Sequence, residues 1–173
     1  LEELPHLQKE IIRQCIAGGR PVITATQMLE SMVTSPAPTR AEASDVANAV
    51  FDGSSAVMLS GETAVGVDPT NVIRTMSRIA RRADEEMDYD AWARQLAEMR
   101  MTEGEGNSSV TDAMTMASWR ATQELGVENV ICISGSGFTV RSMARFRPEA
   151  NILGFSVNEA AVQQLTLSSV SYT

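Results

Sequence analysis

The sequence predicts an α/β protein whose strands run parallel. Two short apolar runs, Val22–Ala25 and Ala56–Leu59, are typical of buried strands, and a helical stretch separates them. A strand–helix–strand order of this kind places the two strands parallel, with the helix packed on the sheet. The same alternation of strands and helices returns after residue 110, so the fold class is expected to hold along the chain.

The first expected element is an amphipathic helix over Leu4–Ile16, because its apolar side chains recur at helical spacing. Two glycines, Gly18 and Gly19, end this helix before the first strand. After the strand, Met28–Met32 fits a single helical turn. Pro36 and Pro38 then favour an extended loop.

The second helix is expected to begin at a capping box formed by Thr39 and Glu42. In this motif the threonine hydroxyl accepts from the Glu42 amide, and the carboxylate reaches back to the Thr39 amide. Asp52 and Gly53 end the helix. Its buried face is predicted to comprise Val46, Ala47, Val50 and Phe51.

A third helix follows the second strand, with Asp68 as its N-cap and Pro69 as its first residue. Its predicted buried stripe comprises Val72, Ile73, Met76, Ile79, Ala80 and Ala83. A connecting helix is indicated around Trp92. The polar, glycine-rich stretch Thr102–Ser109 is the expected domain boundary.

The second half repeats the α/β pattern, with strands expected at Asn129–Ile133 and Ile152–Phe155 and helices at Val110–Leu125, 138–146 and 159–167. The helix over Val110–Leu125 is predicted to turn its apolar side chains inward. These are Ala113, Met114, Ala117, Ala121 and Leu125.

Composition narrows the classes of function. The 173 residues include 43% apolar residues and have a net charge of −8, which argues against nucleic acid or an anionic membrane as the main partner. No apolar run is long enough to span a membrane. Cys15 and Cys132 show no metal-binding spacing, so we expect buried free thiols and a reducing, cytoplasmic setting. A chain that starts with Leu1 inside a helical pattern is expected to be part of something longer.

Polar side chains follow both early strands. Thr26 follows the first strand, and Ser60 and Glu62 follow the second. In α/β folds, ligands bind at the carboxyl ends of the strands, so these three residues are candidates for chemistry. Strand alternation would place Thr24 and Thr26 on one face. The alternatives are a threonine that bonds its own backbone, and a strand-ending turn with a solvated Glu62.

A third polar cluster, Ser134-Gly135-Ser136-Gly137, joins a strand to a helix and is followed by Thr139. Backbone amides and hydroxyls in such a turn can face one anion. The cluster lacks the third glycine of the dinucleotide fingerprint, because Val140 stands there. A tight turn with no ligand is the alternative.

The string ITATQMLESM, followed in order by PTRAE, SDVANAV, DG and MLSGET, resembles pyruvate kinase. The resemblance implies that residues 1–101 are the last two βα units of a TIM (β/α)8 barrel. It further implies that residues 102–173 begin the α/β three-layer C-terminal regulatory domain of that family.

The resemblance implies a glycolytic transferase that moves a phosphoryl group from phosphoenolpyruvate to ADP, giving pyruvate and ATP. Thr26 matches a threonine implicated in protonating the enolate, and a water relay suits its poor acidity. Ser60 and Glu62 match residues of the same pocket. Ser134, Gly135, Ser136, Gly137 and Thr139 match a loop that binds an allosteric effector, usually a sugar phosphate or nucleotide. Ser134 replaces the usual threonine, and Phe138 stands where a polar or basic residue is common.

The resemblance also implies magnesium, potassium and a homotetramer. The family's catalytic lysine, an arginine and the metal ligands have no match here, so no metal site is expected within this chain. The chain alone is therefore expected to be inactive. Two rivals remain: a non-catalytic phosphometabolite-binding regulatory module that uses Ser134–Thr139, and a structural interface piece that uses Met28–Arg40.

Overall fold

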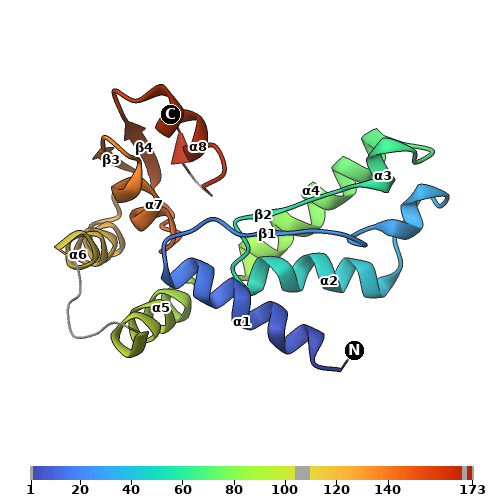
Figure 1. Cartoon of the computed structure of the whole chain (residues 1–173), viewed down its shortest axis with the longest axis horizontal. Helices are drawn as coiled ribbons and strands as arrows, with labels where there is room; N and C mark the ends of the chain where they lie inside the picture. Colours follow the sequence, from blue (N-terminus) through green and yellow to red (C-terminus); the bar gives the residue numbers. More distant parts are fainter. Residues whose placement is uncertain (1, 104–109, 169–170, 173) are drawn as a thin grey trace. The chain divides into compact units, whose positions relative to one another are not determined.

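The structure is a computed structural model that describes residues 2–103, 110–168 and 171–172. Backbone contacts divide the chain into unit 1, residues 1–14 and 21–87, and unit 2, residues 15–20 and 88–173. The elements (Figure 1) are α1 (Leu4–Ala17), β1 (Ile23–Thr24), η1 (Glu30–Val33), α2 (Arg40–Phe51), β2 (Ala56–Val57), α3 (Gly61–Ala64), α4 (Pro69–Glu86), α5 (Tyr89–Glu103), α6 (Val110–Leu125), β3 (Asn129–Ile133), α7 (Phe138–Ala144), β4 (Asn151–Phe155), α8 (Glu159–Leu165) and β5 (Ser171–Tyr172).

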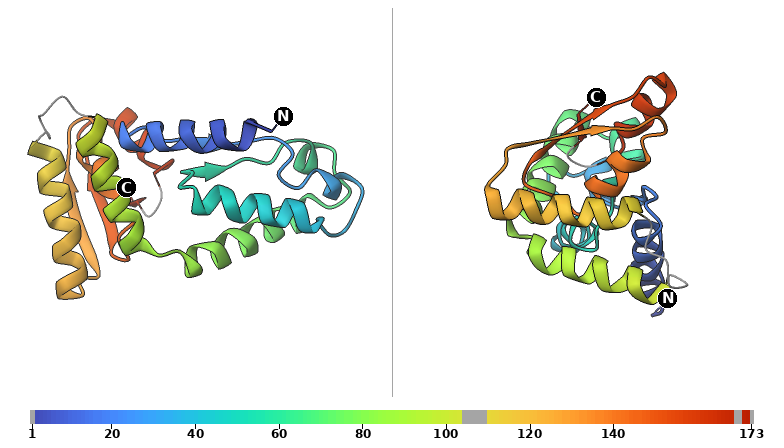
Figure 2. Two further views of the ribbon diagram at one scale, coloured as in Figure 1. Left: turned by 90° about the horizontal axis from the view of Figure 1, so that it is seen from below. Right: turned by 90° about the vertical axis from the view of Figure 1, so that its left-hand side faces the viewer.

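Unit 1 contains the expected parallel pair of strands. β1 and β2 pair with Ile23 opposite Ala56 and Thr24 opposite Val57. The helices α2 and α4 pack against each other (Figure 2). The core of the unit comprises Met28, Leu29, Met32, Val46, Val72 and Met76. The single helical turn expected at Met28–Met32 is a 3-10 helix, η1.

The predicted helix starts in unit 1 are confirmed. Thr39 accepts from the Glu42 amide while the Glu42 carboxylate accepts from the Thr39 amide, and Asp68 accepts from the Asn71 amide ahead of Pro69. The predicted buried faces are partly wrong. Phe51 is 42% exposed and Ile73 is 56% exposed, because α2 and α4 bury their central residues against each other and leave these flanks uncovered.

Unit 2 contains a parallel sheet in the order β3-β4-β5. α7 packs on β3 and β4, and α8 packs on β4. α6 packs against α7. The core comprises Cys132, Val140, Met143, Ala144, Ile152 and Leu165. The linker expected at Thr102–Ser109 lies outside the described residues from residue 104 onward, and α5 includes Thr102.

The predicted orientation of α6 is wrong. Met114 is 60% exposed and Leu125 is 75% exposed, whereas Asp112, Thr115 and Thr122 are buried. The two threonines bond backbone carbonyls of their own helix, Thr115 to Thr111 and Thr122 to Trp119, so their hydroxyls are satisfied inside. Asp112 pairs with Arg145 at the end of α7, and this buried ion pair outweighs the apolar periodicity of α6.

Among the described residues, no helix combines the length and apolar character needed to cross a membrane.

Candidate active site at the strand ends of unit 1

The loops after β1 and β2 leave the same edge of the sheet, because the two strands are parallel. Backbone bonds keep the loops in register: the Met58 amide donates to the Thr24 carbonyl at 2.9 Å. Thr26 lies two residues beyond β1 and Ser60 three residues beyond β2, and both are exposed. The structure therefore places two exposed hydroxyl side chains at one end of the sheet.

Thr24 and Thr26 lie in different environments. Thr24 is buried, with its hydroxyl 2.6 Å from that of Ser54. β1 ends at Thr24, so strand alternation does not extend to Thr26. Thr24 thus ties the strand to the residues before β2, and Thr26 is the hydroxyl left free to face solvent.

Thr26 and Gln27 have left-handed backbone, with φ of 72° and 53°. This region disfavours side chains other than glycine, and a β-branched residue there is a true outlier. Such strain persists only where the surroundings impose it, and it concentrates at functional positions. Sequence patterns do not reveal backbone strain at a threonine, so this feature was not predicted.

Glu62 joins the two loops. Its side chain is 1% exposed, with one oxygen accepting from the Leu29 amide at 3.0 Å and the other from the Ser60 amide at 2.7 Å. Burial opposes the charge, but the backbone amides that donate to the carboxylate outweigh it and lower the pKa of Glu62. Glu62 is therefore an ionised internal brace, and the alternative of a solvated side chain is wrong.

Glu42 is a second carboxylate brace, beyond its role in the capping box. It accepts from the amide and hydroxyl of Ser31 at 2.7 Å and 2.5 Å, and from both groups of Thr39. Burial favours the neutral acid, but these four donors prevail and lower the pKa of Glu42. Glu42 therefore fastens η1 to the start of α2. The sequence signalled only the bonds to Thr39.

Gly66 is a further residue that the sequence analysis missed. A Cβ at Gly66 would lie 2.1 Å from the Glu62 carbonyl oxygen. Gly61, by contrast, begins α3 without left-handed backbone, and a Cβ there would meet only Val33 at 3.9 Å. Close packing behind Glu62 thus depends on Gly66.

The candidate anion turn of unit 2 is a β3–α7 connection with exposed Gly135 and Ser136. Gly137 has left-handed backbone, with φ of 73°, and precedes α7. Ser134 accepts from the Thr139 amide at 3.4 Å, and Arg141 donates to the Ser136 carbonyl at 3.2 Å. Some polar groups of the turn are thus already paired within the protein.

The geometry of unit 1 defines a class of protein: an α/β chain with barrel-type βα units and a polar site at the strand ends. Residues 1–73 match a family model described as "Pyruvate kinase, barrel domain", and residues 112–172 match "Pyruvate kinase, alpha/beta domain". The chain belongs to the pyruvate kinase family.

Individual relatives support this family assignment. The chain is 40% identical to the pyruvate kinase of Clostridium acetobutylicum, over 97% of this chain and 34% of the relative. It is 46% identical to that of Lactobacillus delbrueckii subsp. bulgaricus, over 90% of this chain and 26% of the relative. A pyruvate kinase crystal structure from Cryptosporidium parvum matches with a TM-score of 0.91 and 35% identity, over 99% of this chain and 34% of that one. The chain thus spans about a third or less of its relatives.

A second structure is described as Cryptosporidium parvum pyruvate kinase in complex with ADP. It matches with a TM-score of 0.85 and 35% identity, over 98% of this chain and 33% of that one.

Proposed function

We propose that this chain is part of a pyruvate kinase that transfers a phosphoryl group from phosphoenolpyruvate to ADP, and that it supplies the enolate-protonation side of the site. In this proposal residues 1–101 belong to the barrel and residues 102–173 to the C-terminal regulatory domain. The observation that supports it best is the strained, exposed Thr26 at the same sheet edge as Ser60, with Glu62 bonded to both loops, in a chain of this family.

The roles follow from the chemistry of each group. Thr26 presents a hydroxyl to the ligand but is a weak acid, so it orients a water that delivers the proton to the enolate carbon. Ser60 holds that water by a hydrogen bond. Glu62 acts through the backbone, because both its oxygens accept amide protons from the two loops. It is a positioning residue for Thr26 and Ser60.

Among the described residues no group of three or more His, Cys, Asp and Glu side chains is suitably placed to hold a metal ion. The carboxylates of Glu42 and Glu62 are already engaged by hydrogen-bond donors. In this proposal the magnesium, the potassium and the groups that neutralise the transferred phosphoryl are supplied by the rest of the parent enzyme, because the family's residues for them have no match in this sequence.

The proposal extends to regulation and assembly. Ser134, Gly135, Ser136, Gly137 and Thr139 form an effector turn for a sugar phosphate or nucleotide, supported by the exposure of its centre and by the match of residues 112–172 to the family's α/β domain. The parent enzyme is a cytoplasmic, glycolytic homotetramer. The isolated chain should show no ADP-dependent pyruvate formation.

A chimera tests the catalytic proposal. Replacing the matched third of the Clostridium acetobutylicum enzyme with this chain should give an active kinase in a coupled pyruvate assay. In that chimera Thr26→Ala should lower kcat by about 10²–10⁴-fold, the range of general acid–base catalysis. Thr26→Ser, which keeps the hydroxyl, should retain most activity. An active chimera whose kcat is unchanged by Thr26→Ala would remove Thr26 from the reaction.

The regulatory module is the second candidate, favoured by the exposed Gly135 and Ser136. Titration of the chain with fructose bisphosphate, glucose 6-phosphate and AMP tests it. Saturable binding that is lost in Ser136→Asp supports an effector turn. Absence of binding with all three leaves the turn structural.

A further inference from the structure

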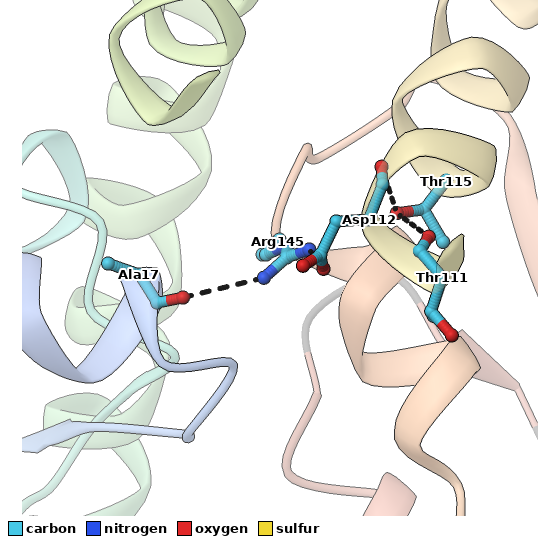
Figure 3. Close-up of polar contacts among 5 residues, drawn as sticks. All are labelled: Ala17, Thr111, Asp112, Thr115 and Arg145. Atoms are coloured by element: carbon cyan, nitrogen blue, oxygen red, sulfur yellow. Dashed lines mark hydrogen bonds and ion pairs between the residues drawn. The ribbon is translucent and has the colours of Figure 1, made fainter. Parts of the chain in front are cut away.

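One arginine at the end of α7 joins α5, α6 and residue 17, the end of α1, all within unit 2. Figure 3 shows Arg145, which follows α7, with Asp112 of α6 on one side and Ala17 of α1 on the other. Its Nη2 lies 2.7 Å from the Asp112 carboxylate, and its Nη1 donates to the Ala17 carbonyl at 3.5 Å. Trp92 of α5 donates through Nε1 to the Arg145 carbonyl at 2.8 Å. The residue thus bonds to α5, α6 and the end of α1 at once.

The junction is buried. Arg145 is 8% exposed and Asp112 is 7% exposed. The guanidinium also lies 5.5 Å from the centre of the Phe146 ring. Burying two charges is expensive, and apolar residues of the same size often serve stability equally well. A buried pair of this kind is therefore better explained by the geometry it imposes than by its stability.

The Ala17 carbonyl is the group that needs a partner. The Gly19 amide donates to the Ile16 carbonyl at 2.9 Å and the Arg20 amide to the Cys15 carbonyl at 2.8 Å, with Gly19 at φ of 65°. These two bonds form a Schellman cap, which satisfies the carbonyls before Ala17 but not that of Ala17 itself. Arg145 donates to the Ala17 carbonyl, and its positive charge suits the negative end of α1.

The capped turn delivers the chain into β1. Only residues 18–22 separate α1 from that strand, and Pro21 among them has a fixed φ. Opening of the cap would free this segment. The conformation of residues 17–20 therefore depends on how firmly the end of α1 is held.

We propose that Arg145 is a positioning residue, which with Asp112 locks the capped turn at the end of α1, over residues 17–20. The lock is a property of unit 2 and does not depend on the proposed reaction. A lysine at 145 keeps the charge but lacks the planar fork whose two nitrogens reach Asp112 and Ala17 separately.

Amide hydrogen exchange of the 173-residue chain, resolved at Gly19 and Arg20, tests the lock. Arg145→Lys should speed exchange of these two amides by about tenfold, with little change elsewhere in α1. The matched control is Arg120→Lys on α6, whose exposed ion pair with Glu124 lies within one helix. Exchange of the Gly19 and Arg20 amides should not change in this variant. Unchanged protection in Arg145→Lys would overturn the proposal.

A second variant guards against simple misfolding. Arg145→Met combined with Asp112→Leu removes both charges and keeps the volume, so the unfolding midpoint should stay near that of the wild type. The Gly19 and Arg20 amides should still exchange about tenfold faster. If the double variant regains full protection, packing alone fixes the turn and Arg145 has no positioning role. Because hydrogen exchange is measured without substrate, a negative result for Arg145 says nothing against the proposed reaction.

Discussion

Thr26 and Gln27 show how much the candidate site depends on unfavourable backbone. Gln27 is exposed and has left-handed backbone with φ of 53°. Glycine adopts this conformation without strain, whereas other residues lose about 1–2 kcal/mol. Gln27→Gly should therefore raise the free energy of unfolding, by about 0.5–1 kcal/mol after allowing for the greater freedom of glycine in the unfolded chain. Urea denaturation measures the change.

The same substitution elsewhere provides the control. Gln14 is exposed in the C-terminal half of α1 and donates to Glu10. Gln14→Gly should destabilise the chain by about 1 kcal/mol, because glycine weakens a helix interior. If both variants lose stability alike, the backbone at Gln27 is not under strain.

Glu62 makes stability depend on pH. Its pKa is lowered by the amides that it accepts from, against the effect of burial. A lowered folded-state pKa means that the stabilisation is complete above the unfolded pKa, about 4.3 for Glu, and is lost as the pH falls through the folded value. Glu62→Gln should lower stability at pH 7 by about 1–3 kcal/mol, as expected for a broken buried charged network. It should also flatten the acid side of the stability curve.

Glu42 has a lowered pKa too, so Glu42→Gln is the necessary comparison in the same thermal unfolding series. Each single variant should remove part of the acid dependence, and the double variant should remove more than either. An acid limb of unchanged slope in Glu62→Gln would contradict the role given to that carboxylate.

At the scale of elements, α3 and the loop after it depend on one glycine. Gly66→Ala would place a Cβ 2.1 Å from the Glu62 carbonyl, a backbone atom that cannot move without disturbing α3. Overpacking of this kind usually costs about 1–3 kcal/mol. Gly61→Ala in α3 is the matched control and should be neutral, because its Cβ finds space. Chemical denaturation measures the stability of both variants. Equal unfolding midpoints for Gly66→Ala and Gly61→Ala would contradict the close approach of Gly66 to the Glu62 carbonyl.

Helix ends were the most predictable elements. The caps at Thr39 and Asp68 depend on residues next to them in sequence, so the pattern alone identified them. The orientation of α6 was not predictable in this way. Its buried face holds Asp112 because Arg145, 33 residues away, needs a carboxylate. Apolar periodicity assumes that burial follows hydrophobicity, and a buried ion pair breaks that assumption.

The candidate site also has features that local sequence predicts and features that it does not. The position of Thr26 and Ser60 at strand ends followed from the order of the elements. The left-handed backbone at Thr26 did not, because a threonine gives no sequence signal for it, and neither did the brace formed by Glu62, which joins residues 33 positions apart. Local sequence therefore identified which residues gather at the site, whereas their conformations required the three-dimensional structure.

At the scale of the whole molecule, unit 2 presents an uncovered apolar sheet face. Ile131, Ile133 and Phe155 are 66%, 81% and 56% exposed, and Ile133 pairs directly with Phe155 across β3 and β4. Cys132 and Ile152 point to the opposite face, which α7 and α8 cover. Contiguous apolar surface of this kind favours association and binds hydrophobic dyes.

The combined variant Ile133→Thr and Phe155→Thr should therefore reduce both self-association and dye binding without loss of fold. Threonine keeps a high strand propensity while removing most of the apolar surface. Sedimentation velocity over a range of concentrations, together with anilinonaphthalene sulfonate fluorescence, measures the two effects. The matched control is Ile152→Thr on the covered face, which should instead destabilise the sheet and raise dye binding, because it places a hydroxyl in the core. Association that persists unchanged in the double variant would show that the chain associates through another surface.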